Sequence, residues 1–256
     1  MSLLSTETLL YDNQREEPRI QVVETPERRE LRFGNDITQS ARSHRTPELL
    51  ALDYTRAMMA GLLFLPDAAT VLHVGLGAGS IPSFIHRNFS SVRQHVVELS
   101  GEVIQVAYRY FDLPRSRRIT VVCADGAEFL RTCTERFDLI FLDAFHAEGV
   151  PPHLAAPTFL SQARAHLNNG GWLVSNAWGS DRALLRKTVQ KLGEQFADLY
   201  AISVRVHSNV ILIGGNPTRG LSMDLLRRRA RALEDLVPLE FTHWAERIRP
   251  GRMAPE

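Results

Sequence analysis

The stretch Thr70-Val71-Leu72-His73-Val74-Gly75-Leu76-Gly77-Ala78-Gly79 decides the fold of this chain. Its first half is a short apolar run of the length of a buried strand, and a glycine-rich turn follows and opens a helix. Gly75 and Gly77 let the backbone turn sharply and approach a ligand, and Gly79 lets the following helix pack on the strand. This order predicts the first unit of a nucleoside-binding α/β domain, although glycine turns of this kind also occur without a ligand.

The alternation of strands and helices continues along the chain. Further strands are expected at Val96–Glu98, Ile119–Cys123, Leu139–Asp143 and Gly171–Ser175, and helices at Ile81–Phe89, Glu102–Phe111, Ala127–Cys133 and Ala156–Leu167. Such an alternation builds right-handed βαβ units and a parallel sheet. Tyr200–His207 and Val210–Ile213, joined by Ser208-Asn209, predict a closing antiparallel hairpin, and Met223–Asp235 predicts an Arg-rich amphipathic helix. The fold class is therefore α/β, with a Rossmann-like, mostly parallel sheet of seven strands.

The N-terminal segment has a different pattern. Ile20–Glu24, Arg29–Phe33 and Ile37–Ser40 read as short strands separated by turn residues. We expect a small β-hairpin module over residues 1–45 and the Rossmann-like cofactor-binding domain over residues 46–256. Thr46 as N-cap and Pro47 at the first helical position predict a helix that runs to about Leu63.

Acidic residues stand where the predicted strands end, which is where open α/β sheets bind ligands. Glu98 lies 19 residues after Gly79, a position from which a carboxylate can accept both ribose hydroxyls. Asp125, followed by Gly126, can accept the adenine amino group or cap the next helix, and both roles can hold together. Asp143 ends an apolar strand and has few structural reasons to be acidic. These residues predict a site for an adenosine-containing molecule.

The spacing of the glycines narrows the choice of cofactor. The chain has Gly75-x-Gly77-x-Gly79 and not the G-x-G-x-x-G of dinucleotide sites. Together with the antiparallel hairpin, which by analogy suits methyltransferase-like sheets, this favours S-adenosylmethionine or its decarboxylated form over NAD.

Composition excludes several other classes. The 256 residues carry a net charge of only +1, so no overall field points to nucleic acid or to an acidic membrane. The two cysteines have no metal-ligand spacing, and we expect no metal. Because the N-terminus has no signal-peptide pattern and no apolar run is long enough to span a bilayer, we expect a cytoplasmic protein.

An ordered set of motifs resembles the spermidine synthase (polyamine aminopropyltransferase) family from about Ile20 to Pro217. The residues that carry the resemblance are Gly34–Ser40 ("L-D-G-x-x-Q", with Gln39 at the glutamine), Leu52–Thr55 (with Tyr54 at the helix tyrosine), Glu98–Ile104 ("E-I-D-x-x-V-I"), Ala124–Leu130 ("G-D-A-x-x-F-L"), Phe137–Asp143 ("Y-D-V-I-I-x-D") and Leu167–Gly171 ("L-x-x-G-G"). The resemblance implies the fold of S-adenosylmethionine-dependent methyltransferases, aminopropyl transfer to a polyamine, and a homodimer associated through the N-terminal region. It also implies that Gln39 belongs to the cofactor site. Tyr54 could line the acceptor pocket, although an aromatic residue on a helix is more often part of the core.

Three positions depart from the family pattern. Ala78 replaces the acid of the family's "G-G-G-D-G-G" loop, Thr55 replaces a glutamine or histidine, and His146 replaces the second acid of "S-S-D-P". In the family these residues contact the aminopropyl group or the acceptor, so the adenosine site carries over better than the polyamine specificity.

The chemistry needs an amine that has lost its proton and is held in line with the sulfonium carbon. Asp143 is the best candidate to position the amine, and His146 is either the base or a loop histidine without a chemical role. Methyl transfer from S-adenosylmethionine and a non-catalytic, cofactor-binding dimeric paralogue are the alternative interpretations.

Overall fold

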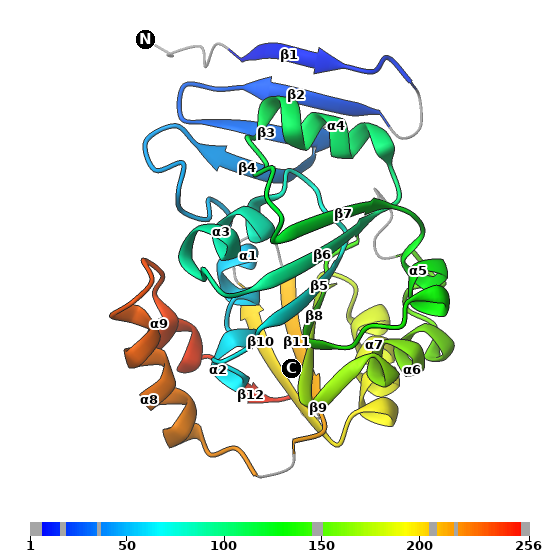
Figure 1. The fold of residues 1–256 in the computed structure, drawn as a ribbon, viewed down its shortest axis with the longest axis vertical. Helices are drawn as coiled ribbons and strands as arrows, with labels where there is room; N and C mark the ends of the chain where they lie inside the picture. Colours follow the sequence, from blue (N-terminus) through cyan, green and yellow to red (C-terminus); the bar gives the residue numbers. More distant parts are fainter. Residues whose placement is uncertain are drawn as a thin grey trace.

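The structure is a computed structural model that describes residues 7–15, 19–34, 37–144, 151–204, 209–217 and 220–251. Its centre is an eight-stranded sheet in the order β12-β10-β11-β9-β8-β5-β6-β7 (Figure 1). The strands are β5 (Thr70–Val74), β6 (Arg93–Glu98), β7 (Ile119–Cys123), β8 (Phe137–Leu142), β9 (Leu167–Trp178), β10 (Asp198–Val204), β11 (Asn209–Gly215) and β12 (Arg249–Pro250).

The pairing of these strands confirms the predicted fold class. β7, β6, β5, β8 and β9 are parallel neighbours, whereas β11 runs antiparallel to β9 and β10 antiparallel to β11. The two-residue strand β12 adds an eighth strand beside β10 that sequence patterning did not predict. The connection between β10 and β11 lies outside the described residues, and Asn209 begins β11 instead of forming the turn.

Helices cover both faces of the sheet (Figure 1). One face packs against α1 (Asp53–Met58), α2 (Gly61–Phe64), α3 (Ser80–Asn88), α8 (Met223–Glu234) and α9 (Phe241–Ala245). The other packs against α5 (Gly126–Thr132), α6 (Pro157–Ala165) and α7 (Arg182–Gln195). Side chains alternate along each strand, so Phe141 and Val174 enter the first core while Ile140 and Leu173 enter the second. α7 was not predicted from the sequence. Its N-cap is Asp181, which accepts hydrogen bonds from the backbone of Ala183 and Leu184.

The helix expected from Thr46 to Leu63 is wrong in its first half. Residues 46–52 form a turn and an extended segment, and the Thr46 hydroxyl bonds to Ser43 instead of capping a helix. Leu50 and Leu52 are both buried, so packing of this segment outweighs the local helix signal. Gly61 brings α2 against the sheet, because a Cβ there would lie 2.5 Å from Cγ2 of Val174.

The N-terminal segment forms a sheet of its own with the order β1-β2-β3-β4. Its strands are β1 (Thr8–Asp12), β2 (Ile20–Glu24), β3 (Arg28–Phe33) and β4 (Ile37–Ser43), so the expected hairpin is a four-stranded antiparallel sheet. Ile20, Val22 and Leu31 pack against α4 (Gly101–Tyr110). The N-terminal sheet is thereby fixed over the end of the central sheet (Figure 1).

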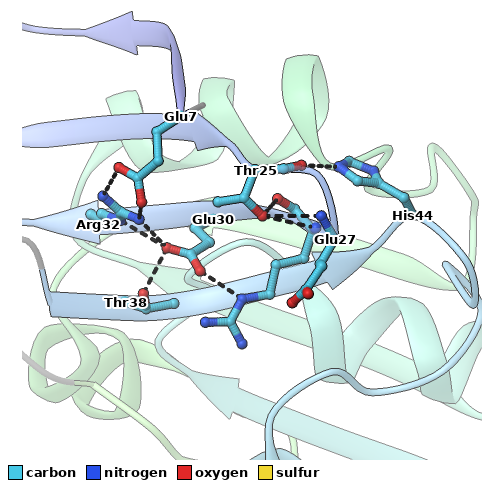
Figure 2. Close-up of polar contacts among 8 residues, drawn as sticks. Glu7, Thr25, Glu27, Glu30, Arg32, Thr38 and His44 are labelled. Carbon is cyan, nitrogen blue, oxygen red and sulfur yellow. Dashed lines mark hydrogen bonds and ion pairs between the residues drawn. The ribbon is translucent and has the colours of Figure 1, made fainter. Parts of the chain in front are cut away.

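The opposite face of the N-terminal sheet carries a buried carboxylate. Glu30 is 3% exposed and accepts hydrogen bonds from Arg28, Arg32 and Thr38. Arg32 also pairs with Glu7, the residue directly before β1 (Figure 2). Burial raises the pKa of Glu30, but the hydrogen bonds from its three partners outweigh burial and hold the pKa below its usual range. This network joins β3 to Thr38 on β4 and to Glu7, which precedes β1.

Candidate active site

A cavity of about 850 Å³ opens at the carboxyl ends of β5, β6 and β8, beneath the N-terminal sheet. Residues from several elements converge on it. Its lining includes Gln39 and Ser40 from β4, Tyr54 and Thr55 from α1, Gly75–Gly77 from the glycine turn, Glu98–Ser100, Ala124–Gly126, Asp143 and Ala144, and Asn176, Trp178 and Asn209 from β9 and β11. The cavity therefore lies where the ends of parallel strands are expected to bind a ligand.

The glycine turn forms the floor of this cavity. Gly75 has a φ of 98°, and a Cβ there would lie 2.3 Å from the carbonyl oxygen of Asp143. Gly77 also has a positive φ, of 53°, and a Cβ there would lie 3.6 Å from Cβ of Ser40. Only glycine fits the first position, because both the backbone conformation and the neighbouring carbonyl exclude a side chain.

Gly79 has a different role from the one expected. It caps α3 in the left-handed conformation, with a φ of 75°, and a Cβ there would meet Cδ1 of Leu113 at 2.7 Å. It lines a small depression beside α3, together with Arg42 and Asp112, and not the main cavity. The close approach that requires glycine here is to the segment after α4, not to β5.

Glu98 ends β6 with its carboxylate at the cavity. Its Oε2 accepts a hydrogen bond from the backbone N–H of Leu76 at 3.0 Å, and its Oε1 accepts one from Ser100 at 2.9 Å. The carboxylate therefore ties the glycine turn to the start of α4 and is held in one orientation. Each carboxylate oxygen can accept more than one hydrogen bond, so this geometry is compatible with the expected ribose contacts.

Asp125 is the N-cap of α5. Its Oδ1 accepts hydrogen bonds from the backbone of Ala127 and Glu128, and its Oδ2 lies 2.7 Å from Nε2 of His153. Burial raises the pKa of Asp125, but the bonds from His153 and the helix backbone outweigh it and lower the pKa. The capping role is confirmed. Gly126, which follows, brings α5 close to β5, because a Cβ there would lie 2.6 Å from Cγ1 of Val74.

Asp143 follows β8 directly and sits among polar side chains. Its Oδ1 accepts a hydrogen bond from Nδ2 of Asn176 at 2.9 Å, and Oδ1 of Asn176 accepts one from Nδ2 of Asn209 at 2.9 Å. Burial raises the pKa of Asp143 to about 6, although the bonds from Asn176 and Tyr54 oppose that shift. A carboxyl group with this pKa is mostly ionised at neutral pH and can take up a proton.

Tyr54 reaches the same carboxyl group from α1. Its hydroxyl donates a hydrogen bond to the backbone carbonyl of Gln39 at 2.9 Å and also contacts the Asp143 carboxyl. Burial, followed by the charge of Asp143, raises the pKa of Tyr54 well above its usual value, so the phenol keeps its proton. Gln39 and Tyr54, which the resemblance assigned to separate roles, are joined by this bond.

The three departures from the family pattern fall in different places. The hydroxyl of Thr55 donates to the carbonyl of Leu52 at 2.6 Å in the cavity wall, and Ala78 is buried with Ile20 and Val22 under the N-terminal sheet. His146 lies outside the described residues. His153, which follows the undescribed segment, contacts Asp125.

Sequence reasoning missed Asn176 and Asn209. Both are buried polar residues, 3% and 6% exposed, within strands whose other buried residues are mostly apolar. The expected strand ended at Ser175, which hid the signal. An amide side chain in the run Leu173-Val174-Ser175-Asn176-Ala177 was the available hint, because buried polar groups need partners.

The fold and the cavity define a class: the Rossmann-like transferases built on the S-adenosylmethionine-dependent methyltransferase fold. A family model described as "Methyltransferase domain" matches residues 71–171. Within this class the chain belongs to the polyamine aminopropyltransferase family. It is 30% identical over 229 residues to a polyamine aminopropyltransferase of Neisseria meningitidis, covering 88% of this chain and 86% of the relative.

Two solved structures resemble the chain. A spermidine synthase in complex with the transition state analogue AdoDATO gives a TM-score of 0.77 at 17% identity, covering 94% of this chain and 85% of that one, and supports the fold. Human methyltransferase-like protein 13 in complex with SAH gives a TM-score of 0.68 at 26% identity, covering 73% and 92%. Both aminopropyltransferases and methyltransferases are thus similar to this chain, and the protein is a transferase. No helix of the described residues is long and apolar enough to cross a membrane.

Proposed function

We propose that this protein alkylates an amine with an adenosyl sulfonium compound, and that the reaction is aminopropyl transfer from decarboxylated S-adenosylmethionine to a polyamine. The observation that carries the proposal is Asp143, a carboxyl group with a pKa raised to about 6 at the wall of the large cavity. The family to which the chain belongs supports the aminopropyl group.

The cavity fits the adenosyl part of such a co-substrate. Glu98 presents an oriented carboxylate for the ribose hydroxyls, and Asp125 stands at the adenine end beside Gly126. Apolar side chains at this end, Leu99, Val103 and Leu154, can cover the adenine ring. With the adenosine held there, the sulfonium group comes over Gly75 and Gly77, next to Asp143.

The reaction then follows from the residues that line this end. The nitrogen lone pair of the amine attacks the carbon bonded to sulfur, the N–C bond forms, and the C–S bond breaks with its electron pair going to sulfur. The product sulfur compound is a neutral thioether, and the amine proton passes to Asp143 and then to water. Holding the amine and the sulfonium carbon together supplies much of the acceleration, and the base supplies a typical factor of about 10²–10⁴.

Methyl transfer is the second candidate, and Ala78 is the observation that favours it. The family's acid at this position helps to hold the aminopropyl end, and here the residue is a buried alanine among apolar neighbours. Loss of that negative charge weakens the case for a cationic aminopropyl tail and removes a repulsion toward the carboxylate of S-adenosylmethionine.

Mass spectrometry of the product separates these candidates. The purified protein is incubated with S-adenosylmethionine or with its decarboxylated form, each with a panel of polyamines, and the masses of the amines are compared before and after. An aminopropyl increment on a polyamine is the expected result. A methyl increment supports the second candidate. If neither increment appears while methylthioadenosine binds, the chain is the non-catalytic paralogue.

We also propose that the protein is a homodimer that associates through the N-terminal sheet. β1 is an edge strand, and its Leu9 and Leu10 are 53% and 36% exposed. Unpaired edges and exposed leucines are suited to contact with a second copy. Light scattering at micromolar concentration should give twice the chain mass, and a monomer would contradict the proposal.

A further inference from the structure

Asp143, Asn176 and Asn209 form a continuous row of hydrogen bonds across three elements, in which both asparagines are buried and Asp143 is partly buried. Asn209 on β11 donates to Asn176 on β9, and Asn176 donates to Oδ1 of Asp143 after β8, with both donor–acceptor distances at 2.9 Å. All three side chains line the cavity.

The chemistry of these groups fixes which one donates and which one accepts in each hydrogen bond. An ionised carboxylate has no donor, so the amide of Asn176 must turn its Nδ2 toward Asp143. The opposite orientation would place the amide oxygen against a carboxylate oxygen. The Oδ1 of Asn176 then faces Asn209, whose Nδ2 donates to it and holds the amide in place.

We infer that Asn176, held by Asn209, is a positioning residue that keeps Oδ1 of Asp143 as a hydrogen-bond acceptor and leaves Oδ2 as the oxygen that takes the proton of the substrate amine. This inference rests on the proposed function, in which Asp143 is the base. A proton on Oδ1 would meet the N–H of Asn176, whereas a proton on Oδ2 leaves the bond from Asn176 intact.

Tyr54 can satisfy Asp143 in both protonation states. The phenol has one proton, and the structure gives it two partners, the carbonyl of Gln39 and the carboxyl of Asp143. When Asp143 carries a proton, Tyr54 can donate to Gln39 and accept from the carboxyl group. When Asp143 is ionised, the phenol proton can turn to the carboxylate. The proton balance is closed: one proton leaves the amine nitrogen as the N–C bond forms, rests on Oδ2, and leaves for water.

The other charged or titratable groups near the carboxyl come from separate elements. Tyr54 on α1 contacts it directly, and His73 on β5, Glu98 at the end of β6, Asp125 before α5, Arg19 before β2 and His153 before α6 line the same cavity. Removing the amide of Asn176 changes none of these groups, so a shift in the titration of Asp143 reports the lost hydrogen bond together with the change in solvation at the carboxyl.

The test measures the pKa of Asp143 in the full-length protein by carbon-13 NMR of labelled aspartate, with Asp143→Asn used to assign the signal. Asn176→Leu removes the bond to the charged form, so the pKa of Asp143 should rise by about one unit or more. Asn209→Leu removes the hydrogen bond that orients the amide of Asn176 and should raise the pKa of Asp143 by less. Ser175→Ala is the matched control, because Ser175 is equally buried on the same strand and, within the described part of the chain, its hydroxyl donates to the carbonyl of Asn176 and not to Asp143.

A kinetic measurement extends the test to the reaction. In each asparagine variant the acidic limb of kcat/KM should move to higher pH by the amount that the pKa of Asp143 rises in the NMR titration, while calorimetry shows that methylthioadenosine still binds. An unchanged titration of Asp143 in both variants would overturn the inference, and Asn209→Leu decides it if Asn176→Leu does not fold. If the wild-type protein transfers nothing to any amine, the proposed function fails, whereas the NMR titration still reports whether Asn176 holds the carboxylate.

Discussion

At the scale of single residues, Glu98 is the side chain on which the co-substrate site depends most. Its two oxygens are already oriented by Leu76 and Ser100, so a ribose would meet a preorganised acceptor. Glu98→Gln keeps the shape but replaces one acceptor with a donor. Because hydrogen bonds to charged groups contribute about 1.5–3 kcal/mol each, affinity for methylthioadenosine should fall at least about tenfold. Isothermal titration calorimetry measures this.

The matched control for Glu98 is Glu128→Gln. Glu128 lies on α5, three residues after Asp125, and its exposed side chain pairs with Arg131 on its own helix. Exposed ion pairs of this kind contribute little, so affinity should be unchanged. Equal affinity of the wild type and Glu98→Gln would mean that the adenosine does not bind at the end of β6.

At the scale of elements, the glycine turn after β5 packs directly against the backbone of Asp143, beside the proposed sulfonium site. Gly75→Ala requires a side chain where φ is 98° and the Asp143 carbonyl lies 2.3 Å from the new Cβ. We expect the free energy of unfolding to fall by more than about 1 kcal/mol, together with a loss of affinity for methylthioadenosine.

Gly193→Ala provides the control, since Gly193 lies within α7 and a Cβ there meets no atom within 4 Å. Alanine favours a helix over glycine by about 0.5–1 kcal/mol, so this variant should be slightly more stable. Urea unfolding of the two variants compares them directly. If Gly75→Ala is as stable as the wild type and binds as well, the turn does not have the constrained geometry described here.

The same elements show what sequence could and could not predict. The sequence pattern located the carboxyl ends of the strands. Glu98, Asp125 and Asp143, which stand at those ends, all line one cavity. Asn176 was missed because it is in the interior of β9, where its role depends on a neighbouring strand. Residues 46–52 were mispredicted because a local helix signal competed with the burial of Leu50 and Leu52, which only the tertiary structure reveals.

At the scale of the whole molecule, two buried groups make opposite contributions to stability as pH falls. His73 is buried with Nε2 bonded to Gln94, and burial lowers its pKa from 6.5 to about 4. Below pH 6.5 the unfolded chain binds a proton at this histidine and the folded chain does not. The free energy of unfolding therefore falls by up to about 3 kcal/mol between pH 6.5 and 4. Asp143, with its pKa raised from 3.8 to about 6, keeps a proton that the unfolded chain releases, so it adds up to about 3 kcal/mol over the same range.

Asp143→Asn removes one of these contributions and exposes the other. Above pH 6 the variant should be more stable than the wild type, because a buried charge has been replaced by an amide. Between pH 6.5 and 4 it should lose stability more steeply than the wild type. Urea unfolding at several pH values checks both expectations, and parallel pH dependences of the two proteins would show that Asp143 is not a buried titrating group.

The central claim is that the crevice after β8 is where the amine reacts, with Asp143 as the base. The most direct measurement is single-turnover transfer from preloaded protein to a polyamine, in the wild type and in Asp143→Asn, with affinity for methylthioadenosine determined in parallel. The account predicts that the variant binds methylthioadenosine within a few-fold of the wild type and transfers about 10²–10⁴ times more slowly. Transfer at the wild-type rate by Asp143→Asn would contradict the account.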